Sequence, residues 1–358
     1  MTAPNHEATR INNAIQYIQS AGFTFSDEIL KDYYICLKTK PFIILAGMSG
    51  TGKTQITRLF AKAINAHYTL ISVSSAWKSD NDLLGFFDKA SGTFKETRFV
   101  TLIRAAIQSF KRGMPDLFFV CLDEMNLARV EHYFAKFLSA MEALNIEERK
   151  ITLDGTGEVL YWPPNLLFVG TVNMDETTFA FSDKVLDRAN SLEFTMTLDD
   201  VFAESVKKTP PDPQPFTFQD FMASRKDLTD PTVREVSKRW RGEIAQIWKM
   251  LEPLNYHFGY RIRDEIELFL ANASGLLEER VAFDLSIKQK ILPKISGRGD
   301  SLKLLLMNLQ DVFTEKKYRY SAKKVEEMKK RLIRDDFTGY YPGQLPPRRA
   351  GLVTIGGD

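Results

Sequence analysis

Residues 47–54 read Gly47-Met48-Ser49-Gly50-Thr51-Gly52-Lys53-Thr54 and directly follow the apolar run Phe42-Ile-Ile-Leu-Ala46. A glycine, four residues and then Gly-Lys-Thr is the pattern of a phosphate-binding loop, and it stands here between a predicted buried strand and a predicted helix. The glycines let successive backbone N–H groups point at phosphate oxygens, which side chains would otherwise block. This stretch therefore predicts a nucleoside triphosphate site at the end of a strand.

The last residues of this loop carry its charge and its metal ligand. Lys53 is expected to bring a positive charge to the β- and γ-phosphates, and the Thr54 hydroxyl is expected to ligate Mg²⁺. The helix that begins there aims the positive end of its dipole at the same phosphates. A glycine-rich turn without a ligand is the alternative, but the preceding strand and the Lys-Thr ending favour the phosphate loop. We assign nucleotide contacts to residues 47–54 and to Gln55.

The composition is that of an ordinary globular protein of about two domains, with 358 residues, 44% of them hydrophobic and 26% charged. A net charge of +2 gives no reason to expect binding to a polyanion. The two cysteines, Cys36 and Cys121, lie in apolar runs and are predicted core residues without a disulfide or zinc spacing. Since neither a signal peptide nor an apolar stretch long enough for a bilayer is found, we expect a cytoplasmic protein without a membrane partner.

Apolar runs and helical patterns alternate over residues 41–205, which predicts an α/β nucleotide-binding domain with a parallel sheet flanked by helices. A short helical lead-in over 1–40 precedes it. Residues 206–345, which begin with a proline-rich break at 209–215 and are mostly helical after it, form a predicted helical lid, and 346–358 form a tail. The predicted strands are 42–46, 68–73, 117–122 and 166–170, the predicted helices 53–64, 99–111 and 130–144, and a predicted hairpin covers 150–162.

A second motif is the apolar run that starts at Leu117 and ends in two acids, Asp123 and Glu124. This is the appearance of a Walker B element, in which Asp123 holds Mg²⁺ through water and Glu124 polarises the attacking water. Two acids at a strand end are unremarkable alone. Downstream of a complete phosphate loop they indicate hydrolysis rather than binding alone.

Two more polar residues follow in the order of a ring-forming P-loop ATPase. Asn173 ends the next apolar run, where a sensor 1 residue contacts the γ-phosphate or the attacking water. Arg188 follows a short predicted helix, and an arginine there is expected to act on the nucleotide of the neighbouring subunit. The alternatives are a strand-end turn residue for Asn173, and for Arg188 a surface ion pair with Asp183 or Asp187. The order and spacing of the motifs favour the functional roles.

The order of these motifs resembles the AAA+ superfamily, and within it the McrB-like motor subunits of modification-dependent (type IV) restriction systems. The likeness is good over residues 40–195 and looser in the lid, where it is sharpest between His257 and Arg263. The stretches that carry it are Asp123-Glu-Met-Asn126-Leu-Ala-Arg129, Gly170-Thr-Val-Asn173-Met-Asp175, Asp187-Arg188 and Asp82-Leu-Leu-Gly85-Phe86.

The resemblance implies a ring, most simply a hexamer, with nucleotide and Mg²⁺ at the subunit interfaces. The ring would drive a McrC-like nuclease in antiviral defence against foreign or modified DNA, which it would meet through a partner. Arg261 becomes the expected sensor 2 arginine of the lid, with Arg263 as the alternative. Separately, Trp77, Phe86, Phe87 and the hairpin tip at 154–157 are candidates for lining a central pore or a partner-binding surface, with core packing favoured for Trp77.

The sequence departs from McrB proteins at the finger position, where those proteins carry several consecutive arginines and this one carries Arg188 alone. The lead-in is also too short to hold a DNA-reading domain. ATP and GTP both stay open, because founding McrB members prefer GTP and most relatives use ATP. The rival functions are a MoxR-like remodelling ATPase and a nucleotide-gated sensor module, the second disfavoured by the complete pair of acids at 123–124.

Overall fold

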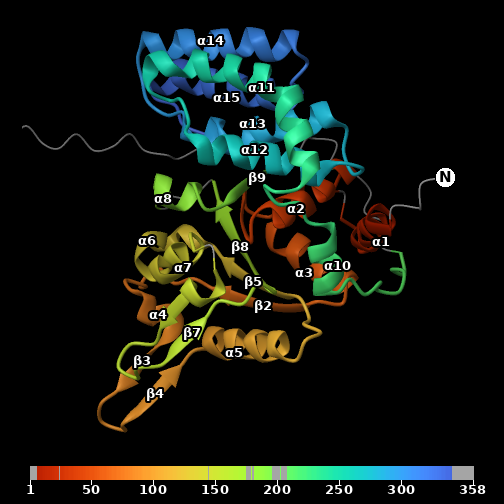
Figure 1. The fold of residues 1–358 in the computed structure, drawn as a ribbon. Coiled ribbons are helices and arrows are strands. Elements are labelled where there is room, and N and C mark those ends of the chain that lie inside the picture. Colours follow the sequence, from red (N-terminus) through yellow and green to blue (C-terminus); the bar gives the residue numbers. More distant parts are fainter. Residues whose placement is uncertain are drawn as a thin grey trace, which may run out of the picture.

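A parallel five-stranded sheet with the strand order β2-β5-β8-β1-β9 lies at the centre of the nucleotide-binding part of the chain (Figure 1). The computed structural model describes residues 6–23, 25–143, 145–174, 179, 181–195, 202 and 208–340. In sheet order the strands are β2 (His67–Ser72), β5 (Phe118–Asp123), β8 (Leu166–Asn173), β1 (Phe42–Gly47) and β9 (Asn190–Phe194). The α/β fold predicted from the sequence, with a helical region behind it, is confirmed.

The strand register sets the position of the predicted site. Gly47 pairs with both Asn173 and Phe194, and Ser72 pairs with Asp123. The carboxyl ends of the strands therefore meet at one edge of the sheet, which is where open α/β sheets bind ligands. All residues of β1 and β8 are buried, as expected for parallel strands covered on both faces.

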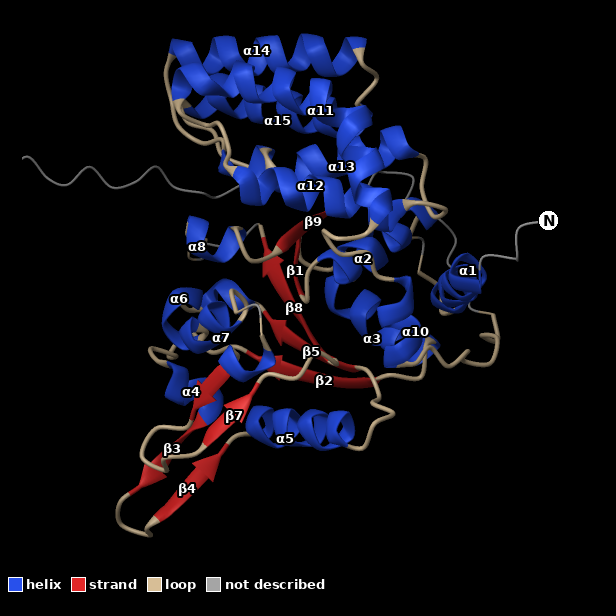
Figure 2. Cartoon of the chain, viewed as in Figure 1, coloured by secondary structure: helices blue, strands red, loops and turns tan. Residues whose placement is uncertain are grey.

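Helices cover both faces of the sheet (Figure 2). On one face Phe60 of α3 packs against Phe119, with ring centroids 6.2 Å apart. On the other face Phe137 of α7 packs against Phe168 at 5.4 Å. The helices of this part are α1 (His6–Ser20), α2 (Asp27–Thr39), α3 (Lys53–Ala63), α4 (Asp80–Leu84), α5 (Arg98–Lys111), α6 (Val130–Tyr133), α7 (Ala135–Ala140) and α8 (Asp183–Leu186).

Two hairpins, β3 (Gly85–Asp88)–β4 (Thr93–Glu96) and β6 (Lys150–Thr152)–β7 (Val159–Tyr161), project from the bottom of the domain in Figure 1. Arg104 of α5 links them, because it contacts Glu96 at 3.2 Å and Glu158 at 2.5 Å. Phe86 in the first hairpin is 57% exposed. The second hairpin was predicted from the sequence and the first was not.

Helices α11 to α15, residues 231–335, form a helical region stacked on the sheet at its β1–β9 side (Figure 1). It is joined to the sheet by Glu193 of β9, which is buried and pairs with Lys288 at 3.2 Å and with Lys324. No helix in the described ranges is long and apolar enough to cross a membrane. The elements of this region are α11 (Pro231–Leu251), η3 (Glu252–Leu254), α12 (Tyr260–Ala273), α13 (Glu279–Lys290), η4 (Leu292–Lys294), α14 (Asp300–Glu315) and α15 (Arg319–Asp335). The preceding helix α10 (Phe218–Ser224) packs on the α/β part instead, where Phe218 meets Phe110 of α5 with ring centroids 6.0 Å apart.

The structure corrects one predicted element and adds another. The single helix expected over 130–144 is wrong, because the chain breaks at Phe134, between α6 and α7, where φ is −113°. Strand β9 was not predicted, because its sequence contains polar residues and does not resemble a buried strand. Asn190 is nevertheless buried, and its side-chain amide donates a hydrogen bond to the Cys36 carbonyl at 2.8 Å. Cys36 and Cys121 are free and buried, as predicted.

Candidate active site

The phosphate loop leaves β1 and enters α3 at Lys53, in a shape that requires glycine at two positions. Gly50 and Gly52 have φ of +79° and +84°, in the left-handed region that glycine adopts at no steric cost. A Cβ on Gly47 would lie 2.7 Å from the carbonyl oxygen of Phe194. The loop is therefore shaped by glycine conformation within it and by close packing of β9 against its start.

The Lys53 ammonium group lies inside the curve of the loop. Its Nζ is 3.0 Å from the Gly47 carbonyl oxygen and 2.5 Å from that of Met48, and the side chain is buried. The hydroxyl of Thr51 also donates to the Met48 carbonyl, at 2.9 Å. Lys53 thus sits where the loop would receive phosphate oxygens, which are stronger acceptors for an ammonium group than backbone carbonyls.

Thr54 and Asp123 come together at the edge of the sheet as the sequence predicts. Thr54 Oγ1 donates to Asp123 Oδ1 at 2.7 Å. Mg²⁺ in nucleotide sites is held by one or two protein oxygens together with phosphate oxygens and water. A hydroxyl and a carboxylate at this separation fit that requirement. Among the described residues no three His, Cys, Asp or Glu side chains gather into a metal site built of protein ligands alone.

Glu124 and Asn173 also meet, although they come from different strands. Asn173 Nδ2 donates to Glu124 Oε1 at 2.9 Å. The backbone of Glu124 is in the left-handed region, with φ 52° and ψ 46°, which is rare for a residue with a side chain. Strained backbone of this kind persists where the surroundings fix it and is concentrated at functional sites. The Glu124 carboxylate is held in place by Asn173.

Thr171 is a part of the site that the sequence reasoning missed. Its hydroxyl donates to Asp123 Oδ1 at 2.7 Å and accepts from the Glu124 backbone N–H at 2.9 Å. One side chain therefore fixes both acids. Its position two residues before Asn173 could have indicated it, because alternate residues of a strand lie on the same face of the sheet. Gly170 beside it leaves space for Met125, since a Cβ there would lie 1.9 Å from Met125 Sδ.

Arg188 lies at the opposite edge of the sheet from the phosphate loop of its own chain. Asn190 pairs with Ile43, near the start of β1, whereas Gly47 ends that strand. Ile43 and Gly47 are four residues apart along β1, a distance of about 13 Å. Arg188 is thus placed away from the phosphate loop of its own chain.

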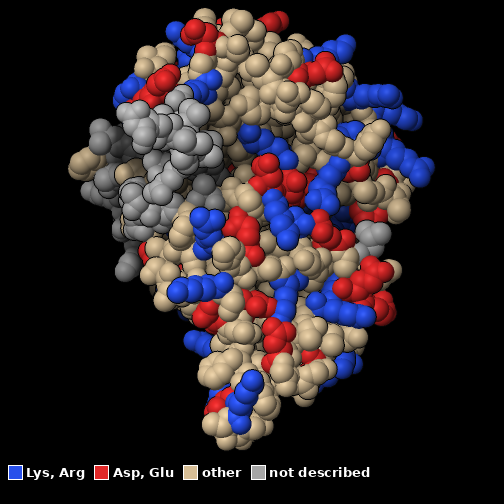
Figure 3. Space-filling view, turned by 90° about the vertical axis from the view of Figure 1, so that its left-hand side faces the viewer, with Lys and Arg blue, Asp and Glu red and all other residues tan. Residues whose placement is uncertain are grey.

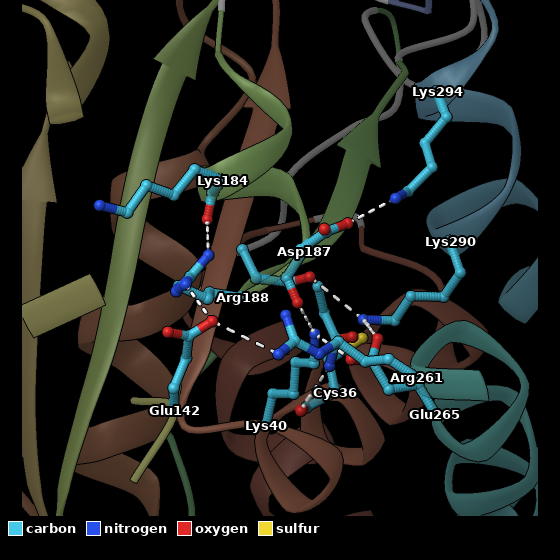
Figure 4. Close-up of polar contacts among 12 residues, drawn as sticks. Cys36, Lys40, Glu142, Lys184, Asp187, Arg188, Arg261, Glu265, Lys290 and Lys294 are labelled. Atoms are coloured by element: carbon cyan, nitrogen blue, oxygen red, sulfur yellow. Dashed lines mark hydrogen bonds and ion pairs between the residues drawn. The ribbon is translucent and has the colours of Figure 1, made fainter. Parts of the chain in front are cut away.

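The contacts of Arg188 are within the chain (Figure 4). Its side chain is 9% exposed and pairs with Glu142, rather than with Asp183 or Asp187 as the alternative reading expected. Nε donates to the Leu138 carbonyl at 2.6 Å, and NH1 donates to the Lys184 carbonyl at 2.5 Å.

Arg261 does not lie at the phosphate loop of its own chain either. Its NH2 is 3.4 Å from the Glu142 oxygen that Arg188 contacts, so the two arginines lie side by side. Arg263 pairs with Asp264 at 2.5 Å and lies over the Tyr260 ring. A contact between Arg261 and nucleotide stays a prediction. Asp175, part of the quoted motif, falls outside the described residues.

Comparisons with known proteins bear on the family and the fold of this chain. Residues 42–189 match the family model of an AAA domain of the dynein-related subfamily, and residues 210–337 match a domain of unknown function, DUF8727. A crystal structure of a proposed ATPase from Cytophaga hutchinsonii is 15% identical, with a TM-score of 0.54 over 80% of this chain and 86% of that chain. At this identity the likeness concerns the fold. No curated protein matches the sequence.

Proposed function

We propose that this chain, whose residues 42–189 match the family model of an AAA domain, belongs to the AAA+ superfamily and hydrolyses ATP or GTP in a ring of identical subunits. The observation that carries the proposal is the continuous set of hydrogen bonds that joins the end of the phosphate loop to the two acids and to Asn173. It runs from Thr54 through Asp123, Thr171 and Glu124 to Asn173. A site for binding alone has no need of an acid that is aimed and braced beside the phosphates.

In the proposed mechanism each residue has a distinct task. Lys53 and the loop amides hold the phosphates, and Thr54 and Asp123 would hold Mg²⁺, which neutralises developing charge on the phosphate oxygens when it is bound. Glu124 accepts a hydrogen bond from the attacking water and orients it. Asn173 keeps the Glu124 carboxylate in place and offers its amide to the γ-phosphate or the water.

The ring is supported by the position of Arg188. Head-to-tail contacts between identical subunits bring different faces together, so the edge that carries Arg188 in one subunit can face the phosphate loop of the next. Transition-state charge on the phosphate is then met by an arginine from the neighbour. Acidic and basic side chains are interspersed on the face that carries α8 and α6, between the helical region and the hairpins (Figure 3).

The role of Glu124 is tested by steady-state turnover of ATP and of GTP by the wild type and by Glu124→Gln. Loss of a positioned base typically costs about 10²–10⁴-fold in rate. We expect a loss in this range in kcat, with nucleotide binding preserved because the phosphate loop is intact. Unchanged hydrolysis in the variant would show that the catalytic assignment is wrong. Absence of turnover in the wild type with either nucleotide would favour the sensor module.

For the biological role, the proposal is a McrB-like motor that drives a McrC-like nuclease in antiviral defence, with DNA contacted through the partner in the cytoplasm. The exposed Phe86 on its projecting hairpin supplies an apolar contact point for such a partner. The test is turnover measured with and without the product of the neighbouring gene. A nuclease that raises turnover supports the proposal, whereas a metal-binding client protein as the neighbour would favour the MoxR-like rival.

A further inference from the structure

One carboxylate oxygen, Glu142 Oε1, is shared by two arginines from different parts of the fold (Figure 4). Arg188 follows α8, and its NH2 pairs with this oxygen. Arg261 belongs to the first turn of α12 in the helical region, and its NH2 is 3.4 Å from the same oxygen. The hydrogen bond from Arg188, with a smaller contribution from Arg261, holds the pKa of Glu142 below its usual range. The carboxylate is therefore charged at neutral pH.

Arg188 is held in a retracted position by these contacts. Of its three acceptors, the Leu138 and Lys184 carbonyls are neutral and Glu142 is charged. A side chain that is 9% exposed has to leave such contacts before its guanidinium group can meet the phosphate of another subunit. Hydrogen bonds between ionised groups are about twice as strong as neutral ones, so Glu142 is the strongest of the three contacts that hold Arg188 in place.

The backbone on both sides of Arg188 is anchored, which places the movement in the side chain. The Asp187 carboxylate pairs with Lys294 of η4 at 2.5 Å. The Ala189 carbonyl accepts from Lys290 of α13 at 3.1 Å, and Lys290 is itself buried. The segment is therefore attached to the helical region before and after the arginine, so extension of Arg188 is a movement of its side chain out of its contacts with Glu142 and the two carbonyls.

We propose that Glu142 is a positioning residue that latches Arg188, and that Arg261 opens the latch by taking over the shared oxygen. This inference rests on the proposed role of Arg188 in the neighbouring subunit. Glu142 is 44% exposed, so its charge is partly screened by solvent and the latch is reversible. Arg261 is 52% exposed, so its present pair with Glu142 is weak. A shift of α12 that brings Arg261 closer strengthens its pair with Glu142 and releases Arg188. The position of the helical region thereby controls how often Arg188 of one subunit reaches the nucleotide of the next.

The first test is Glu142→Gln, which keeps the size of the side chain and removes its charge. Because an exposed ion pair is weak, we expect kcat to rise about two- to fivefold, with KM for nucleotide and the melting temperature unchanged. The matched control is Glu279→Gln, which removes a carboxylate paired with Arg239 at 2.6 Å on the surface of the helical region. The control is expected to turn over as the wild type does. A Glu142→Gln rate equal to the control, or below it, overturns the latch.

Double variants show whether Glu142 acts through Arg188. Glu142→Gln is expected to give no increase in a chain that also carries Arg188→Ala, and an undiminished increase there would overturn the proposal. Arg261→Gln is expected to lower kcat in the wild type and to lower it less beside Glu142→Gln; equal losses in both would overturn its role as the opener. If Arg188→Ala alone turns over at the wild-type rate, the proposed function of Arg188 has failed, which is distinct from failure of the latch.

Discussion

The side-chain amide of Asn173 donates a 2.9 Å hydrogen bond to the Glu124 carboxylate, across the gap between the ends of β8 and β5. Asn173 lies in register with Gly47 at the start of the phosphate loop. One residue therefore contacts the acid that is proposed to orient water and lies beside the loop that is proposed to bind the phosphates. This relationship explains how occupancy of the γ-phosphate position and orientation of the water can be linked.

Asn173→Ala is expected to lower kcat by about a hundredfold, the usual cost of losing one preorganised hydrogen-bond donor. Nucleotide affinity should change little, because Lys53 and the loop amides are retained. The measurement is kcat beside the affinity for a fluorescent nucleotide. A large loss of affinity at unchanged kcat would contradict the assignment of Asn173 to the chemical step.

Thr171→Val keeps the shape of the side chain and removes the hydroxyl that fixes both acids. Thr171 is buried, so the Glu124 N–H loses its acceptor, which costs about 1–3 kcal/mol of unfolding free energy. We expect lower thermal stability together with a lower kcat. The matched control, Thr171→Ser, retains the hydroxyl and should preserve most of the activity. Equal losses in the two variants would show that the hydroxyl is not the feature that matters.

Gly170→Ala places a Cβ 1.9 Å from Met125 Sδ, next to Glu124. Because Met125 is fully buried, the overlap is expected to cost about 1–3 kcal/mol and to displace the acid, lowering kcat. Gly242→Ala in α11 is the control, since a Cβ there meets no atom within 4 Å. Adding Met125→Ala to Gly170→Ala should recover part of the lost stability and kcat, because it removes the overlapping side chain. If the effects of the two substitutions simply add, the loss does not come from this overlap.

Asp32 gives stability a pH dependence. It is buried, and both of its carboxylate oxygens accept a hydrogen bond from the Gln289 amide at 2.7 Å. Burial raises the pKa of Asp32 to about 7, although Gln289 and Lys288 partly oppose the shift. The folded chain then holds more protons than the unfolded chain between about pH 4 and 7. The free energy of unfolding should fall as pH rises through this window, by at most about 1.4 kcal/mol per pH unit, and the contribution should be constant above it.

Asp32→Asn should flatten this slope in pH-dependent denaturation. Asp227→Asn is the control, because the pKa of this exposed carboxylate is lowered by Thr229 and it titrates below the window. A slope that persists in Asp32→Asn would assign it to another group.

Much of the active site was readable from the sequence, because short motifs fix its parts locally. The phosphate loop needs its glycines and its Lys53 at set spacing, and the two acids follow directly from one apolar strand. Asn173 was placed correctly at the same edge, since parallel strands align their carboxyl ends. Thr171 could have been found from the alternation of side chains along β8.

The remaining features depend on contacts between distant segments. Strand β9 reads as polar, and it is buried only because Lys288 and Lys324 of the helical region compensate Glu193. The convergence of Arg188 and Arg261 on Glu142 depends on how the helical region is stacked on the sheet. No local pattern encodes that placement, and this is why the shared contact of the two arginines with Glu142 was not predicted from the sequence.

The central claim is that one catalytic site is built from two subunits, and mixing two inactive chains tests it most directly. Glu124→Gln lacks the base but retains Arg188, whereas Arg188→Ala lacks the arginine but retains the base. Each chain alone should turn over at less than about a hundredth of the wild-type rate. In an equal mixture about a quarter of the sites in a ring combine both intact residues, so turnover should return towards that fraction. Wild-type turnover by Arg188→Ala alone, or no recovery on mixing, would contradict the account.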